Sequence, residues 1–246
     1  MKFYLGTHIV SHAGHFPRAF ISANVLRAKN RQSDFPVNDW ILDSGAFTEL
    51  SLYGHYRFDV GEYATLINRW VWCGHLELAV TQDYMCEPFM LAKTGLTVKD
   101  HQRLTIERYD ELRRLAVAEV MPVLQGYDPA EYVGHIAMYG RRLAHGQRVG
   151  VGSVCKRNSN PSAIVAVLEG IKERRPNLRL HGFGLKLTAL HNAYICSLLY
   201  SADSMAWSFA ARKQGQNPNS LSVAQDFANR IENESAIKAY QMDLMK

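Results

Sequence analysis

Short apolar runs typical of β-strands alternate with longer amphipathic segments along almost the whole chain. The strand-like runs cover residues 3–7, 40–42, 76–81, 120–124, 148–152, 178–183 and, less clearly, 202–207. The helical segments cover residues 17–29, 61–72, 98–118, 129–139, 161–174 and 188–200, and a last one runs from about residue 220 towards the C-terminus. This alternation with short connections predicts βαβ units and a parallel sheet.

About seven such repeats favour an α/β fold of the TIM type, a (β/α)8-like barrel, over an open sheet. The sequence offers no clear eighth strand, so we expect a barrel that is irregular or lacks one strand. No low-complexity linker interrupts the 246 residues, of which 47% are hydrophobic. We therefore predict a single barrel domain over residues 1–246 with a full core.

The charge and the cysteines of the chain indicate which partners and which cellular compartment suit it. The 28 Lys and Arg against 23 Asp and Glu give a net charge of +5, which suits a polyanion without requiring one. The four cysteines are scattered without a Cys-x-x-Cys pair, as expected in a reducing compartment. The N-terminus lacks a signal-peptide core, and no apolar run reaches the roughly 18 residues of a membrane span. We expect a soluble, cytoplasmic protein with no membrane partner.

Polar residues and glycines recur where the predicted strands end, and in barrels these carboxyl ends build the active site. The residues at these positions are His8, Asp43, Asp83, Gln125, Gly126, Gly152, Ser153, His181, Gly182 and Asp203. Asp, Gly and Ser are also common in ordinary turns. Asp43, in the segment DWILDSGAFTEL, would suit a turn or a helix N-cap. Their recurrence at corresponding ends predicts one shared pocket.

The residue types in this pocket suit a planar heterocycle that carries both donors and acceptors. A guanine presents N1–H and its exocyclic amine as adjacent donors, which one carboxylate can accept together, and O6 as an acceptor. Asp83 and Gln125 are the right types for these two tasks, and Phe47 could stack on the ring.

Five motifs carry a resemblance to a known family. They are DSGAF at 43–47, QDYMCEP at 82–88, VLQG at 123–126, VGVGSV at 149–154 and HGFG at 181–184. In order and approximate spacing, over about residues 4–212, they resemble the motifs of tRNA-guanine transglycosylases. The segment GSVCKRN and the short chain are more similar to the 7-deazaguanine DNA transglycosylases of phages and bacterial modification islands. The resemblance implies an enzyme that exchanges guanine in DNA for a 7-deazaguanine base of the preQ0 type through a covalent glycosyl-aspartate.

Residue by residue, the resemblance also implies a base-binding set. It places Asp43 beside the base, where it would manage a proton, and Asp83 and Gln125 at the guanine edge. It places the ring of Phe47 on one face of the base and His181 on the other, where the family has methionine. The other members of the implied set are Ser44, Gly126, Gly152, Ser153 and Gly182.

The nucleophilic aspartate of the family falls near the segment ADSMAW. Strict register places Ala206 where that aspartate belongs, and Asp203 is the nearest carboxylate. We expect Asp203 to be the nucleophile, with Asp43 as the competing candidate. A chain that kept the pocket without a nucleophile would be a non-catalytic protein that binds guanine or 7-deazaguanine, and that alternative stays open.

Five basic residues just past strand ends could hold DNA phosphates, although each would equally suit a solvated surface. They are Lys156, Arg157, Lys186, Arg212 and Lys213. Cys155 precedes two of these cations, which could lower the pKa of its thiol and make it a nucleophile. A small buried residue behind the pocket is the favoured interpretation of Cys155.

The sequence departs from the tRNA enzymes in lacking their C-terminal zinc site of three cysteines and a histidine, since no cysteine follows Cys196. His8, His12 and His15 have a spacing that a metal could use, but they span a predicted strand–loop junction, which favours ordinary loop or pocket histidines. We expect no metal and no cofactor. The implied partners are DNA and a free 7-deazaguanine base, while the oligomeric state stays open.

Two further enzymes compete with this interpretation. A transglycosylase acting on tRNA would share the fold, but the missing zinc subdomain weighs against it. A sugar-phosphate lyase could use Lys186 as a Schiff-base residue, but it would leave Phe47, Asp83 and Gln125 without a purpose. The sequence does not identify which 7-deazaguanine is inserted or in which DNA sequence context.

Overall fold

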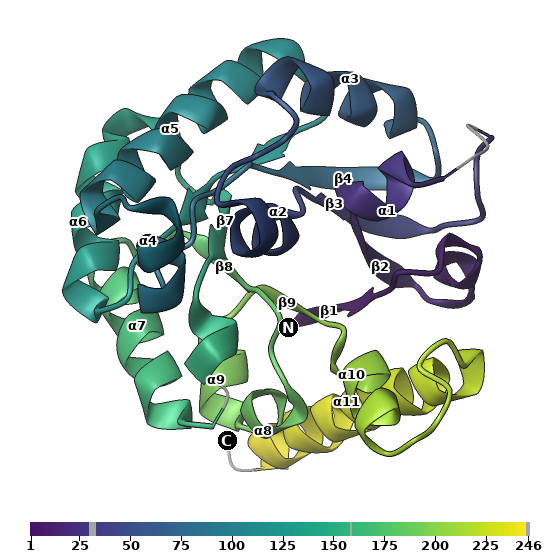
Figure 1. Cartoon of the computed structure of the whole chain (residues 1–246). Helices are drawn as coiled ribbons and strands as arrows, with labels where there is room; N and C mark the ends of the chain where they lie inside the picture. Colours follow the sequence, from purple (N-terminus) through teal and green to yellow (C-terminus); the bar gives the residue numbers. More distant parts are fainter. Residues whose placement is uncertain (30–32, 158, 245–246) are drawn as a thin grey trace.

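The computed structural model describes residues 1–29, 33–157 and 159–244, and these residues form one parallel sheet with helices around it (Figure 1). The strands are β1 (Lys2–Gly6), β2 (Arg18–Ser22), β3 (Asp39–Asp43), β4 (His75–Val80), β5 (Val120–Met121), β6 (Val123–Leu124), β7 (Arg148–Val151), β8 (Arg179–Gly182) and β9 (Ser201–Ser204). Their order is β5-β4-β3-β2-β1-β9-β8-β7-β6. The predicted α/β barrel of the TIM type is therefore confirmed.

The two ends of this order meet at Pro122, the single residue between β5 and β6. The carbonyl of Met121 accepts the N–H of Thr81 in the loop after β4, at 3.1 Å. The carbonyl of Pro122 accepts the N–H of Gly150 in β7, at 2.9 Å. Since proline has no N–H to donate, the ladder changes partner there. The predicted strand 120–124 is one strand interrupted by a seam, at which the nearly closed barrel changes from pairing with β4 to pairing with β7.

The strand that the sequence did not reveal is β2. A helix was predicted over residues 17–29, and this prediction is wrong, because 18–22 form a strand and only Ala23–Arg27 (α1) is helical. Phe20 faces the barrel interior, while Ala19 and Ile21 pack on the outer side. A strand buried on both faces shows no alternation of polar and apolar residues, so its pattern resembles a buried helix. With β5 and β6 taken as one strand, β2 supplies the eighth strand.

Most of the remaining helices follow the strands and cover the outside of the barrel, whereas α2 (Ala46–Tyr53) lies over its centre (Figure 1). The others are α3 (Val60–Trp70), α4 (Pro88–Thr94), α5 (Val98–Leu115), α6 (Pro129–Tyr139), α7 (Pro161–Arg174), α8 (Leu187–Leu190), α9 (Ala193–Leu198), α10 (Ala206–Lys213) and α11 (Leu221–Leu244), with short 3-10 helices η1 (Val10–His15), η2 (Gly140–Arg142) and η3 (Val154–Arg157). The predicted helices 129–139 and 161–174 are confirmed residue for residue. Both begin with proline at a first-turn position, where its missing N–H is not needed.

Two other predictions near the C-terminal strands need correction. The helix predicted over 188–200 is two short helices, because the side chain of Asn192 accepts the N–H groups of Tyr194 and Ile195 and starts α9 afresh. The strand predicted over 202–207 ends at Ser204, and α10 begins at Ala206.

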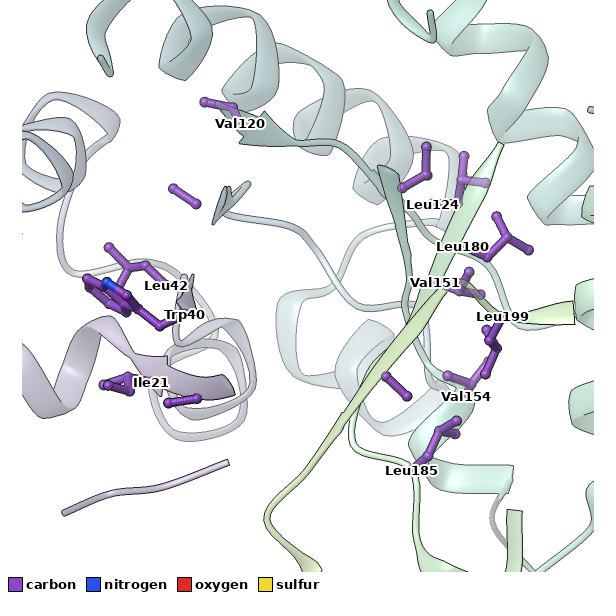
Figure 2. Packing of buried hydrophobic residues seen from close by; sticks show 14 of the residues in the cluster. Ile21, Trp40, Leu42, Val120, Leu124, Val151, Val154, Leu180, Leu185 and Leu199 are labelled. Carbon is purple, nitrogen blue, oxygen red and sulfur yellow. The ribbon is translucent and has the colours of Figure 1, made fainter. Parts of the chain in front are cut away.

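Apolar side chains fill the barrel in two layers. Between the strands and the outer helices lie residues such as Trp40, Leu42 and Val151, all buried (Figure 2). Inside the barrel, a smaller cluster includes Tyr4 and Met121. Burial of each large side chain contributes about 1.5–3 kcal/mol to folding. The inner cluster closes the barrel axis, so an open site must lie at one end of it.

None of the helices in the described ranges combines the length and apolar composition needed to cross a bilayer.

Candidate active site

A cavity of about 170 Å³ lies at the carboxyl ends of the strands, where α2 is drawn over the centre of the barrel (Figure 1). Its lining residues are Phe20, Asp43, Ala46, Phe47, Val80, Asp83, Met85, Gln125, Gly152, Ser153, Cys155, Phe183, Gly184 and Asp203. The structure thus brings together seven of the residues that the sequence assigned to one pocket. The cavity is smaller than the roughly 300–1,000 Å³ of sites for drug-sized ligands. It suits a single base better than a whole nucleotide.

Asp43 is the last residue of β3, and its carboxylate has two roles. Its Oδ2 accepts the N–H of Gly45 at 3.1 Å, so the residue does stabilise the turn into α2. Gly45 needs its positive φ of 80°, and a Cβ there would overlap the side chain of Asn24. The same carboxylate lines the cavity. Burial, followed by the negative charge of Asp203, raises the pKa of Asp43 from 3.8 to about 6.

Asp83 and Gln125 are joined directly. Gln125 Nε2 donates to Asp83 Oδ2, and Gln125 Oε1 accepts from the hydroxyl of Ser153 at 3.1 Å. A hydroxyl can donate or accept and fits either orientation of the amide, whereas an ionised carboxylate only accepts, so the amide nitrogen faces Asp83. Burial, followed by the charge of Asp43, raises the pKa of Asp83 from 3.8 to about 7.

The backbone of Gln125 is held from behind by two buried side chains. Its N–H donates to Nδ1 of His135 at 2.9 Å, and its carbonyl accepts from Nε2 of Gln102 at 2.7 Å. Burial lowers the pKa of His135 to about 3, which keeps the ring neutral and Nδ1 an acceptor. Hydrogen bonds therefore hold both the backbone of Gln125 and its side-chain amide, which lines the cavity.

Gly152 and Ser153 explain the glycine-rich motif after β7. A Cβ on Gly152 would overlap the side-chain amide of Gln125, so only glycine leaves that amide its place. Ser153 is the one non-glycine residue with positive φ (60°) in the described part of the chain. Such a conformation costs about 1–3 kcal/mol and is found mainly at functional sites. Here it directs the Ser153 hydroxyl to Gln125.

Asp203 lies in β9 and is 5% exposed. Its Oδ1 accepts from His181 Nε2 at 3.2 Å and from the N–H of Gly184 at 3.1 Å. The other ring nitrogen of His181 pairs with the hydroxyl of Ser201 at 2.9 Å. Ala206, which strict register equates with the family nucleophile, begins α10 and lines a different cavity. Among the two positions, Asp203 alone presents a carboxylate to the site.

Four residues of the implied base-binding set are not in the cavity lining. His181 is buried, and its ring stacks on Phe20 with centroids 5.6 Å apart and planes at 15°. His181 contacts the lining residues Phe20 and Asp203 but does not line the cavity itself, so Phe20 and Phe183 are the rings that join Phe47 in the lining. The other three are Ser44, Gly126 and Gly182, all buried next to lining residues.

Several lining residues were not predicted from the sequence. Phe20 belongs to the misassigned strand β2, and its signal was the apolar run Ala19–Phe20–Ile21. Phe183 and Gly184 lie inside the quoted motif HGFG but were not given a role. Burial raises the pKa of the Cys155 thiol to about 11, which disfavours a thiolate nucleophile at this wall of the cavity.

The five predicted phosphate contacts form two groups along the chain. Lys156 and Arg157 lie in η3, with Lys156 Nζ 4.6 Å from the ring centroid of Phe47. Lys186 precedes α8, and Arg212 and Lys213 lie in the last turn of α10. Contact with DNA stays a prediction for all five.

His8 does not join the cavity lining. Its Nε2 pairs with Asn219 Oδ1 at 2.7 Å, and its ring stacks on Trp207 with centroids 6.0 Å apart. Over residues 1–29, 33–157 and 159–244, no three His, Cys, Asp or Glu side chains gather as a metal site. The expected lack of a cofactor stays a prediction.

Comparison with known families decides the relationship. The family model DpdA, described as DeoxyPurine in DNA protein A, matches residues 1–235. The chain belongs to the DpdA family. A search of curated proteins finds no match to it. Membership in the DpdA family links the chain to deazapurine modification of DNA.

Proposed function

We propose that the protein exchanges guanine in DNA for a 7-deazaguanine base, with Asp203 as the nucleophile. The DpdA family supports DNA as the polymer and favours it over tRNA. The observation that carries the proposal is a single cavity that gathers three carboxylates, those of Asp43, Asp83 and Asp203, together with the amide of Gln125 and three phenylalanine rings. A lyase with Lys186 as its Schiff-base residue would leave this set unused, because Lys186 is not in the lining.

Base recognition is assigned to Asp83 and Gln125. An ionised Asp83 accepts from N1–H and the exocyclic amine of guanine, and the amide of Gln125 donates to O6. The pKa of about 7 means that Asp83 is only partly ionised in the empty cavity near neutral pH. The two guanine donors favour the carboxylate form, so binding of the base lowers this pKa. Phe47, which is 48% exposed at the opening, stacks on the base as it enters.

Bond exchange is assigned to Asp203 and Asp43. A carboxylate oxygen of Asp203 attacks C1′ of the deoxyguanosine, the C1′–N9 bond breaks, and guanine leaves with the electron pair. Asp43, with its pKa of about 6, gives guanine the proton that it needs to leave as a neutral base. A 7-deazaguanine then returns its N9 proton to Asp43 and attacks C1′, which releases the Asp203 carboxylate. Two inversions retain the β configuration, as in retaining glycosidases.

The target nucleotide must leave the DNA stack to reach this cavity, at a cost of a few kcal/mol. His181 and the N–H of Gly184 hold Oδ1 of Asp203, so the nucleophile keeps one orientation before DNA arrives. This fixed orientation lowers the entropy cost of the attack on C1′.

Covalent trapping tests the proposal. The wild type, incubated with guanine-containing DNA, should form an adduct that survives denaturing electrophoresis, and Asp203→Ala should not form it while still binding 7-deazaguanine. Asp43→Ala should keep the adduct but form it slowly. Asp110→Asn, an exposed carboxylate paired with Arg142 on the outer face, is the matched control. An adduct in Asp203→Ala would move the nucleophile to Asp43.

Nucleoside analysis separates exchange from binding. DNA from cells that express the protein and are supplied with a 7-deazaguanine should contain the modified nucleoside by mass spectrometry. Binding of the base without any modified nucleoside or adduct would leave a non-catalytic binding protein in place of the enzyme.

A further inference from the structure

A second cavity lies beside the active site, between the start of α8 and helices α10 and α11. Figure 1 shows these three elements together at the C-terminal part of the chain. The cavity measures about 530 Å³, which is within the range of ligand sites. Buried Trp207 and Phe227 form part of its apolar wall. None of the residues that line it lines the active-site cavity.

Phe209 is an exposed aromatic residue in the lining of this second cavity, which we call the groove. Its ring is 52% exposed although it lines the groove, and two ammonium groups flank it. Lys213 Nζ lies 4.9 Å and Lys186 Nζ 5.9 Å from the ring centroid. Arg230 adds a third cation to the lining, against one acidic residue, Asp226. An exposed aromatic face with basic neighbours is the arrangement by which proteins hold unpaired nucleotides.

Two short chain segments connect the groove to the active site. Gly184 lines the active-site cavity, and Lys186, two residues later, lines the groove. Asp203 lines the cavity, and Ala206, three residues later, lines the groove. Two residues span at most about 7 Å. A DNA strand whose target sugar lies at Asp203 therefore reaches the groove with an adjacent nucleotide.

We propose that this groove binds a nucleotide next to the target in an unpaired DNA strand. Its base stacks on Phe209, and its phosphates contact Lys186 and Lys213. This inference rests on the proposed action on DNA and adds the form of the substrate: the strand around the target is single-stranded or opened. A base in an intact duplex cannot offer its face to Phe209, because its neighbours cover both faces.

Equilibrium binding of a fluorescent single-stranded oligonucleotide that contains one guanine tests the stacking. Phe209→Leu keeps an apolar side chain on an exposed position and removes the aromatic face, so the Kd should rise about 5- to 150-fold. Lys213→Gln should lower the slope of log Kd against log salt by about 0.7, the value for one single-strand phosphate contact. Trp72→Leu, an 85% exposed aromatic before β4 at the opposite end of the barrel, should change neither. Equal affinity of the wild type and Phe209→Leu would overturn the proposal.

Photo-cross-linking tests independently where the nucleotide next to the target guanine lies. 5-Iododeoxyuridine placed next to the guanine should cross-link on irradiation to the α10 peptide that contains Phe209. The same nucleotide placed eight positions away should not. Cross-links only to other segments would overturn the proposal that the groove binds a nucleotide, but they would not contradict base exchange. If the wild type binds no single-stranded DNA, or if it forms the adduct while Phe209→Leu binding is unchanged, the inference fails alone. The proposed function fails only if no adduct forms with duplex DNA either.

Discussion

The amide of Gln125 donates to the carboxylate of Asp83 across the barrel seam. Asp83 follows β4, whose ladder runs to β5, and Gln125 follows β6, whose ladder runs to β7. Pro122 separates these two ladders. The two residues assigned to the guanine edge therefore meet from opposite sides of the position where the sheet changes partner, and the side-chain bond bridges it.

Asp83→Asn should abolish guanine exchange and leave the fold intact. An amide presents a donor to the donors of guanine and leaves a desolvated group unpaired, which costs roughly 1–3 kcal/mol or more in binding. Incorporation of labelled guanine into DNA measures the effect, with Asp110→Asn as control. Incorporation at the wild-type rate would remove Asp83 from base recognition.

The same variant should change how stability depends on pH. Burial raises the pKa of Asp83 from 3.8 to about 7, so the folded state holds a proton that the unfolded chain releases. The stabilisation is complete below about pH 4 and is lost as the pH rises through 7. Between pH 5 and pH 8 the wild type should lose up to about 3 kcal/mol more than Asp83→Asn, at 1.4 kcal/mol per pKa unit. Urea unfolding at the two pH values measures this, and parallel losses would contradict it.

Gly152→Ala should displace Gln125 and lower both base binding and stability. The added Cβ overlaps the amide, so Gln125 must give up its bonds to Asp83 and Ser153. Overpacking of this kind costs about 1–3 kcal/mol. Gly134→Ala is the control, because a Cβ added at Gly134 in α6 would meet no atom within 4 Å, and it should stabilise by about 0.5–1 kcal/mol. Thermal unfolding measures the change in stability, and 7-deazaguanine binding measures the change in affinity for the base. A Gly152→Ala variant that behaves like Gly134→Ala in both measurements would contradict the prediction.

His181→Phe should slow adduct formation without weakening base binding. Phenylalanine keeps the stacking on Phe20 and removes the Nε2 donor to Asp203. Loss of a hydrogen bond to a carboxylate costs about 1.5–3 kcal/mol, which corresponds to a rate roughly 10- to 150-fold lower. Single-turnover adduct formation gives the rate and calorimetry gives the affinity for the base. An equal fall in both would show that His181 supports the base pocket instead.

The sequence predicted the barrel and most of its strands because helices and strands alternate with different hydrophobic periods. It could not reveal β2, since burial on both faces removes the polar positions that mark a strand. It also could not place the turn after Ser204, where strand and helix meet within two residues of similar composition.

The candidate site was predictable as far as it depends on residue type at strand ends. Asp43, Asp83, Gln125 and Asp203 were found in this way, and the structure gathers them in one cavity. The position of His181 was not, because its ring can point to either side of β8 and only packing on Phe20 decides which. Phe209 was not found either, since a single aromatic in a helix carries no signal until its cations are located in space.

The position of β9 in the sheet has a consequence for folding while the chain is being synthesised. This strand fills the gap between β1 and β8, with Asp203 opposite Tyr4. A chain still being synthesised has both of those edges open until residue 204 has left the ribosome. The carboxylate proposed to attack DNA is thus installed by the strand that closes the barrel. Incomplete chains that end before this strand lack both the closed barrel and the carboxylate that we propose as the nucleophile.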